Sequence, residues 1–263
     1  MAGLGRYYEF DLRCRGTPDP DTGYLVNIKD IDRAVRSGVV PELAKLCEER
    51  PAADPVTLVG PFRRLAADAL ARSAPTAEVV SLLWRLTPTY AVEARAPHED
   101  HSDKDLSGKD LSGKDQPAKD QPEGAPVPDV IVKQQFDFAA SHRLHVQTLS
   151  DDENRRTFGK CNNPSGHGHN YRVEIAARVP ADGTGPSLAQ IEPIVDETVI
   201  ERFDHTYLNV DTEDFGDAGV NPSVEHIARR CHELLTPALA AVGAALETVT
   251  VWETDRTSAT YPA

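Results

Sequence analysis

Three stretches in the second half of the chain alternate between apolar and polar or small residues, which is the period of a half-buried β-strand. They are residues 130–145, 168–180 and 246–255. In the second stretch, Tyr171, Val173 and Ile175 fall on one face. We therefore expect three strands in this half of the chain.

Two segments between the second and third of these stretches have apolar residues at spacings of three and four, which is typical of an amphipathic helix. They are residues 187–203 and 221–243. Ser187 and Ser223 precede the first apolar residues and are candidate N-caps. The order strand, strand, helix, helix, strand predicts an α+β fold, an antiparallel sheet with both helices on one face.

Residues 1–96 look like a degenerate partial copy of this pattern. The stretch APTAEVVSLLWRLTP echoes NPSVEHIARRCHELLTP of the second predicted helix, and YAVEAR echoes the last strand. In this alignment Glu78 and Glu93 match Glu225 and Glu253. The copy has no counterpart of the histidine and cysteine stretches described below, so we expect it to be catalytically silent.

Residues 97–128 separate the two halves. The unit Lys-Asp-Leu-Ser-Gly recurs there, and the segment has almost no apolar side chains to bury. Such a composition cannot offset the entropy of ordering the backbone, so we expect a disordered linker. The remaining residues, 129–263, form the predicted catalytic domain.

Charge and cysteine usage narrow the class of protein. The formal net charge of −14 argues against a nucleic-acid-binding surface, and an anionic substrate would need local basic residues. No apolar run is long enough to span a membrane, and the N-terminus lacks the apolar core of a signal peptide. The four cysteines form no Cys-x-x-Cys pair, which favours a reducing, cytoplasmic location.

Histidines gather around the stretch KCNNPSGHGHNY, residues 160–171. His167 and His169 share a strand face, and His142 follows the alternation of the preceding strand. If these strands pair, three imidazoles converge, which is the donor set of a catalytic zinc site; the alternative is a polar surface hairpin. Cys161 in the preceding loop is a fourth ligand, a base or an inert thiol, and the residues alone leave these three open.

Carboxylates supply further candidate site residues. Asp204 next to His205 can orient that imidazole if the backbone turns there. Glu253 lies in the final alternating strand, where a buried carboxylate needs a partner such as the paired N–H donors of a ligand. Glu225 near a helix N-terminus either stabilises the helix dipole or serves function.

Five motifs together resemble the 6-pyruvoyltetrahydropterin synthase family, which includes the 6-carboxytetrahydropterin synthases of queuosine biosynthesis. They are FAASHRL, LSDDENRRTFGKCNNPSGHGHNY, FDHTYLN, NPSVEHIA and VWETD. The resemblance covers about residues 130–261. It implies a T-fold whose subunits assemble through their sheets into a barrel, commonly as a dimer of trimers.

The resemblance also implies roles for particular residues. It implies Zn²⁺ on the three histidines, a base at Cys161, a proton relay at Asp204 and His205, and a pterin anchor at Glu253. Glu225 matches a glutamate that follows a threonine pair in the family. In this sequence Ser223 and Val224 stand in place of that pair, and Glu253, Glu225 and Ser223 are the candidate substrate-binding residues.

The activity implied is the conversion of 7,8-dihydroneopterin triphosphate to 6-pyruvoyltetrahydropterin with loss of triphosphate. Five residues separate Cys161 from His167, which resembles the pyruvoyl-forming branch. The alternatives are the carboxy-forming lyase, acting on the same substrate, and a non-catalytic pterin-binding protein. Lys160, Arg143 and Arg155 are candidate triphosphate contacts. We expect a homo-oligomer, with zinc and without a redox cofactor.

Overall fold

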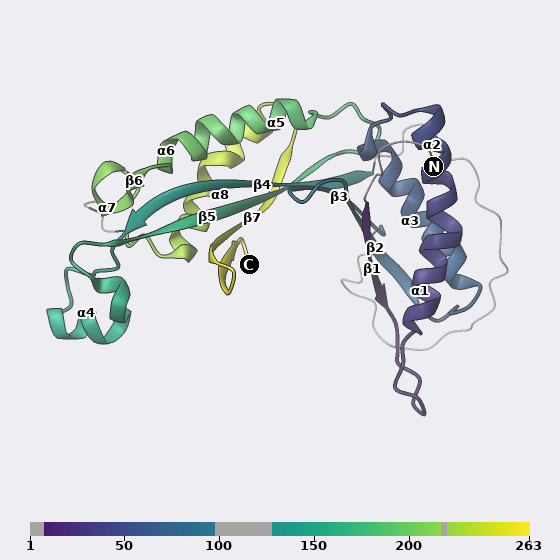
Figure 1. Cartoon of the computed structure of the whole chain (residues 1–263), viewed down its shortest axis with the longest axis horizontal. Coiled ribbons are helices and arrows are strands. Elements are labelled where there is room, and N and C mark those ends of the chain that lie inside the picture. Colours follow the sequence, from purple (N-terminus) through teal and green to yellow (C-terminus); the bar gives the residue numbers. More distant parts are fainter. Residues whose placement is uncertain (1–7, 98–127, 217–219) are drawn as a thin grey trace, which may run out of the picture.

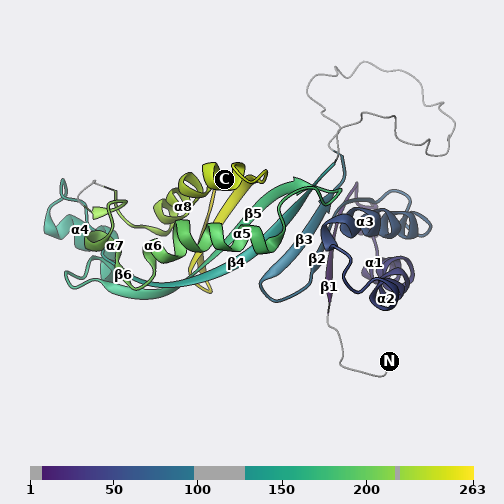
Figure 2. The ribbon, with the colours of Figure 1, turned by 90° about the horizontal axis from the view of Figure 1, so that it is seen from above.

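One antiparallel sheet runs through both halves of the chain (Figures 1 and 2). The computed structural model describes residues 8–97, 128–216 and 220–263. In spatial order the strands are β1 (Glu9–Arg15), β2 (Glu78–Arg85), β3 (Tyr90–Arg95), β4 (Asp129–His142), β5 (His167–Pro180), β7 (Ala245–Thr254) and β8 (Thr257–Tyr261). A short strand, β6 (Thr206–Tyr207), runs parallel to the end of β4. The strands expected in residues 130–145, 168–180 and 246–255 are therefore present as β4, β5 and β7.

Helices cover one face of the sheet in each half (Figure 2). In the first half they are α1 (Ile28–Ala34), the π-helical η1 (Val35–Val39), α2 (Val40–Glu49) and α3 (Pro55–Ala71). In the second half they are α4 (Asp151–Phe158), the 3₁₀-helical η2 (Gly159–Asn162), α5 (Leu188–Val195), the π-helical η3 (Asp196–Ile200), α6 (Glu201–Phe203), α7 (Leu208–Asp211) and α8 (Val224–Ala240). Ser223 caps α8, accepting a hydrogen bond from the backbone N–H of His226.

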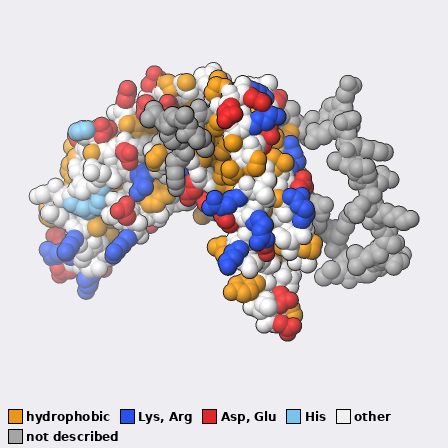
Figure 3. Space-filling model, turned by 45° about the vertical axis from the view of Figure 1, so that its right-hand side comes forward, with side chains coloured by type: hydrophobic (Ala, Val, Ile, Leu, Met, Phe, Trp, Pro, Cys, Tyr) orange, Lys and Arg blue, Asp and Glu red, His pale blue; other side chains and the backbone are white. Residues whose placement is uncertain are grey.

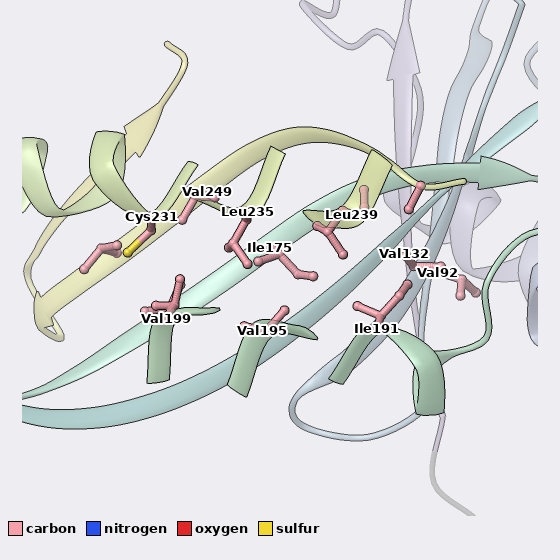
Figure 4. Packing of buried hydrophobic residues seen from close by; sticks show 14 of the residues in the cluster. Val92, Val132, Ile175, Ile191, Val195, Val199, Cys231, Leu235, Leu239 and Val249 are labelled. Atoms are coloured by element: carbon pink, nitrogen blue, oxygen red, sulfur yellow. The ribbon is translucent and has the colours of Figure 1, made fainter. Parts of the chain in front are cut away.

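The core of the second half of the chain lies between the sheet and the helices that begin at Leu188 and at Val224 (Figure 4). Val195 of α5, Leu235 of α8 and Ile175 of β5 are fully buried. Burying one such side chain stabilises the fold by roughly 1.5–3 kcal/mol. The expected α+β architecture, an antiparallel sheet with helices on one face, is confirmed.

The expected T-fold copy at the N-terminus is not confirmed. Residues 78–85 form strand β2, although the sequence alignment matched them to the helix that is α8. Val79, Leu82 and Trp84 are buried against α1–α3, and a short apolar run of this kind fits a strand as well as a helix. The match of Glu78 to Glu225 was therefore wrong, because the two residues lie on different kinds of element.

A buried ion pair joins the two halves where β3 meets β4. The strands pair antiparallel, with Val92 opposite Val132. The Glu93 side chain is only 1% exposed, and its Oε2 lies 3.0 Å from Lys133 Nζ. Burial alone would raise the pKa of Glu93, but the Lys133 charge and hydrogen bond, with Arg95 and Ser81, lower it. The first half thus occupies the outer edge of β4 at this point.

Two further expectations concern the linker and membrane-spanning helices. The linker expected at residues 97–128 lies, except for its two end residues, outside the described residues. Among the helices of the described ranges, none is both long and apolar enough to cross a membrane.

Candidate metal centre and active site

The strand register brings the three predicted histidines together. His142 at the end of β4 lies opposite His167 at the start of β5, and Ala140 lies opposite His169. The imidazole centroids are 4.6 Å apart for His142 and His167, 5.2 Å for His142 and His169, and 4.7 Å for His167 and His169. The three histidines lie on the same face of the sheet as Tyr171, which is the face that packs against the core.

Gly166 allows β5 to begin close to its neighbours. Its φ is +69°, in the region that favours glycine. A Cβ there would lie 3.0 Å from both the His142 carbonyl oxygen and the Tyr207 ring. Glycine at this position therefore lets the strand bearing His167 approach β4 closely.

Glu253 completes the cluster. Its Oε1 lies 3.1 Å from Nε2 of His142 and 3.3 Å from Nε2 of His169. One ligand atom from each of the three histidines and from Glu253 lies within 4.8 Å of the others. The histidines and this glutamate lie far apart in the sequence, but the structure brings the four side chains together.

The protonation of His142 shows that the cluster fits a cation. Its Nδ1 lies 2.7 Å from the carbonyl oxygen of Pro222, which can only accept a hydrogen bond. In the neutral ring Nδ1 therefore carries the proton and Nε2 presents a lone pair. That lone pair faces His167 Nε2 at 3.2 Å and Glu253 Oε1 at 3.1 Å. A proton on His167 satisfies one of these contacts, whereas a cation satisfies them together.

Two further properties of the cluster favour metal binding. Burial, followed by the neighbouring imidazoles, lowers the pKa of His167. Burial also lowers the pKa of His169, although the Glu253 charge acts in the opposite direction. Both rings are therefore neutral at neutral pH and present lone pairs. His169 Nε2 is buried and makes no hydrogen bond within the described residues. Three neutral imidazoles and one carboxylate carry a net charge near −1, which suits a divalent ion such as zinc.

Asparagine side chains hold the loop that leads from His142 to Cys161. Asn209 accepts a hydrogen bond from Arg143 N (2.7 Å) and donates one to Arg143 O (2.9 Å). Asn162 donates to Leu144 O at 2.7 Å, and Leu144 N donates to Cys161 O at 2.8 Å. These bonds fix the backbone of Cys161 relative to the strand that ends at His142.

Two more asparagines continue this arrangement. Asn154, which is fully buried, accepts from Val146 N at 2.8 Å and donates to Val146 O at 2.9 Å. Asn221 accepts from His145 N at 3.1 Å. None of the four asparagines was expected from the sequence to have a role, because an asparagine in a polar loop is common and does not indicate a particular partner.

Cys161 is a free, partly buried thiol. Burial and then the charge of Glu253 raise its pKa, so the thiol is protonated at neutral pH in the protein alone. A positive charge at the histidine cluster would act in the opposite direction. Cys231 is fully buried in the core, and burial raises its pKa to about 12, so it is an inert thiol.

Asp204 and His205 form the pair that the sequence predicted. His205 has a φ of +56°, and this left-handed turn lets its Nδ1 lie 2.7 Å from Asp204 Oδ2. Asp204 also accepts from Ala139 N at 2.8 Å, and this bond, followed by the bond with His205, lowers the pKa of Asp204. The pair is thus anchored to the outer edge of β4, and the His205 side chain is 84% exposed.

A hollow of about 470 Å³ lies beside this pair. Its lining consists of Ala139, Ala140, Ser141, Gly168, His169, Asn170, His205, Thr206 and Tyr207. It therefore reaches both a candidate metal ligand and the candidate relay histidine. Cys161 does not line the hollow, and no hydrogen bond in the described part of the chain joins it to Asp204 or His205.

The remaining predicted residues lie around the cluster. Ser223 and the exposed Glu225 follow Pro222, whose carbonyl holds His142. Arg143 is half-buried, with Nη2 3.3 Å from His145 Nδ1, whereas Arg155 and Lys160 are exposed. Figure 3 shows histidine side chains at this end of the molecule with Lys and Arg side chains near them. Arg155 is itself paired with Asp152 of the same helix.

Comparisons with known proteins identify the family of the chain. A family model described as 6-pyruvoyl tetrahydropterin synthase matches residues 131–263, just over half of the chain. The 6-pyruvoyl tetrahydrobiopterin synthase of Homo sapiens is 39% identical over 133 residues, covering 49% of this chain and 89% of that protein. The enzyme of the same name from Poecilia reticulata is 39% identical over 107 residues, covering 40% of this chain and 71% of that protein.

One solved structure is also similar in sequence. The 6-pyruvoyl tetrahydropterin synthase of Caenorhabditis elegans is 34% identical, with a TM-score of 0.47, and the alignment covers 52% of this chain and 97% of that one. The family model and the relatives match the half of the chain that carries the three histidines, Cys161 and Glu253. The chain therefore belongs to the 6-pyruvoyl tetrahydropterin synthase family.

Proposed function

We propose that the protein is a zinc-dependent lyase that converts 7,8-dihydroneopterin triphosphate to 6-pyruvoyltetrahydropterin and triphosphate. The observation that carries this proposal is the convergence of three imidazoles and one carboxylate within 4.8 Å, in a member of this family. The human relative bears the name 6-pyruvoyl tetrahydrobiopterin synthase. The five residues between Cys161 and His167 favour the pyruvoyl product over the carboxy product.

In this proposal His142, His167 and His169 hold the zinc ion. When bound, zinc supplies Lewis acidity to the hydroxyl oxygens of the substrate side chain, which makes the adjacent C–H bonds more acidic. Cys161 is the base that takes a proton from a carbon of that substituent. Its loop position, fixed through Asn162 and Leu144, supports this role because a base must be held at the carbon it deprotonates.

Asp204 and His205 are the proposed proton relay. Asp204 holds Nδ1 of the imidazole, which leaves Nε2 free to give or take a proton on the substrate side chain. The electron pair of the C–H bond next to the ring passes into the pterin ring, which takes up two protons in all as that carbinol becomes a carbonyl. The electron pair of the next C–H bond expels triphosphate from the last carbon, and the resulting enol becomes the second carbonyl. The substrate is thus rearranged without net oxidation, and no redox cofactor is required.

Substrate contacts are assigned to carboxylates and basic residues. Glu225 and Ser223 contact the pterin in this proposal. Glu253 is the third pterin-binding residue, and its contacts with two imidazoles mean that it must serve the metal side of the pocket as well. Arg143, Arg155 and Lys160 are the proposed triphosphate contacts, because they supply positive charge near the cluster.

We further propose that the working form is a homo-oligomer assembled through the sheet, in the cytoplasm. The four free cysteines support a reducing compartment. Native mass spectrometry tests the assembly: we expect a defined multiple of the subunit mass, and a monomer with full activity would contradict it.

Product analysis tests the activity. Zinc-loaded protein should consume 7,8-dihydroneopterin triphosphate and release 6-pyruvoyltetrahydropterin and triphosphate in equal amounts. Cys161→Ala should lower kcat by at least about 100-fold while still binding zinc. 6-Carboxytetrahydropterin with acetaldehyde would instead identify the queuosine-pathway lyase. Pterin binding without turnover by the wild type would identify a non-catalytic pterin-binding protein.

A further inference from the structure

Tyr171 lies fully buried beside the three histidines. The hydroxyl oxygen is buried and has no hydrogen-bond partner among the described residues. Most buried side-chain polar atoms in native structures have a hydrogen-bond partner. An unpaired hydroxyl next to a binding site therefore indicates a partner that becomes available only when the site is occupied.

The sheet places Tyr171 beside Glu253. Val173 of β5 pairs with Val251 of β7, and both side chains lie in the core. Two residues further towards the site, Tyr171 and Glu253 share that face of the sheet. The Tyr171 ring stacks on Phe138, with centroids 4.9 Å apart, and its edge contacts the His169 ring at 5.5 Å.

At neutral pH a tyrosine hydroxyl keeps its proton, so it can donate a hydrogen bond to a carboxylate such as Glu253. The ring is fixed between Phe138 and the imidazoles, which leaves rotation of the O–H bond as the remaining freedom.

We propose that Tyr171 is a positioning residue whose hydroxyl donates a hydrogen bond to the Glu253 carboxylate when a metal ion occupies the imidazole nitrogens. In the protein alone, Glu253 Oε1 contacts Nε2 of His142 at 3.1 Å and Nε2 of His169 at 3.3 Å. A metal ion bound to those nitrogens replaces both contacts. The carboxylate then needs a donor, and the unpaired Tyr171 hydroxyl is available beside it.

A double-mutant cycle on zinc affinity tests this coupling. The variants are Tyr171→Phe, Glu253→Gln and the double variant, and competition with a chromophoric chelator measures the Zn²⁺ dissociation constant. Tyr171→Phe removes only the hydroxyl. We expect it to weaken zinc binding about 10-fold in the wild-type background and not at all beside Glu253→Gln, because partners of metal-site residues typically contribute about 10- to 100-fold.

An equal effect of Tyr171→Phe in both backgrounds would overturn the proposal, since it would indicate a packing role, and no effect in either would overturn it too. Tyr90→Phe, at the β3–β4 junction, is the matched control and should leave zinc affinity unchanged. The effect of Tyr171 on turnover rests on the proposed function, and there we expect kcat to fall more than KM rises. If the wild type fails to turn over the pterin, the proposed function fails, while the zinc cycle still decides the role of Tyr171.

Discussion

At the scale of single residues, the site depends on side chains that hold other side chains. His142 is oriented by the Pro222 carbonyl, and Cys161 is held through Asn162 and Leu144. None of these partners has chemistry that a sequence pattern indicates. The histidines and Cys161 were predictable because their residue types are rare and closely spaced, whereas asparagines in loops are common and their partners are backbone atoms far along the sequence.

Asn162→Ala should slow turnover while leaving the metal site in place. The change removes the 2.7 Å bond to Leu144 O and frees the loop next to Cys161. We expect kcat to fall about 10- to 100-fold, because misplacing a catalytic group by about 1 Å costs up to about 100-fold. Zinc stoichiometry should stay at one per subunit. Asn163→Ala, at the exposed neighbouring position, is the control, and equal kcat values for the two variants would contradict the positioning role.

At the scale of elements, the pairing of β4 with β5 decides the site. Alternation along each strand predicted which side chains share a face, whereas the pairing of the two strands stood as a condition in the sequence argument. The core-facing residues of both strands lead directly into the histidines. Long alternating strands and amphipathic helices were predictable because burial on one face imposes a fixed period. The strand β2 was not predictable, because its eight residues, with both apolar and β-branched side chains, fit the period of a helix as well as that of a strand. The β3–β4 junction depends on residues distant in sequence and leaves no local signal.

The Glu93–Lys133 pair should stabilise this junction in a pH-dependent way. Breaking a buried pair leaves an uncompensated charge, so Glu93→Gln should lower the free energy of unfolding by about 3 kcal/mol at pH 7. The folded-state pKa of Glu93 is depressed, so its contribution is present above the unfolded-state pKa and is lost as the pH falls through the folded-state pKa. Urea unfolding of both proteins from pH 7 to pH 3 measures this. A difference that stays constant over that range would contradict the ion-pair role.

At the scale of the whole molecule, the residues matched by the family model form only part of the sheet. The family model begins at residue 131, yet the sheet continues from β4 into β3, β2 and β1. The first half therefore covers an edge of β4 that is left open in a protein made of the matched half alone. Open strand edges invite pairing with other molecules, so this arrangement limits which edges remain for assembly. In the described residues, the outer edges of β1 and β8 end the sheet.

The central claim is that His142, His167 and His169 bind one metal ion at the end of β4 and β5. Calorimetric titration of metal-free protein with Zn²⁺ tests it most directly, with His142→Ala and His226→Ala as the paired variants; His226 lies on α8, outside the cluster. We predict one tight site per subunit in the wild type and in His226→Ala, and a loss of at least about 100-fold in affinity in His142→Ala. Equal zinc affinity in all three proteins, or no binding by the wild type, would contradict the account.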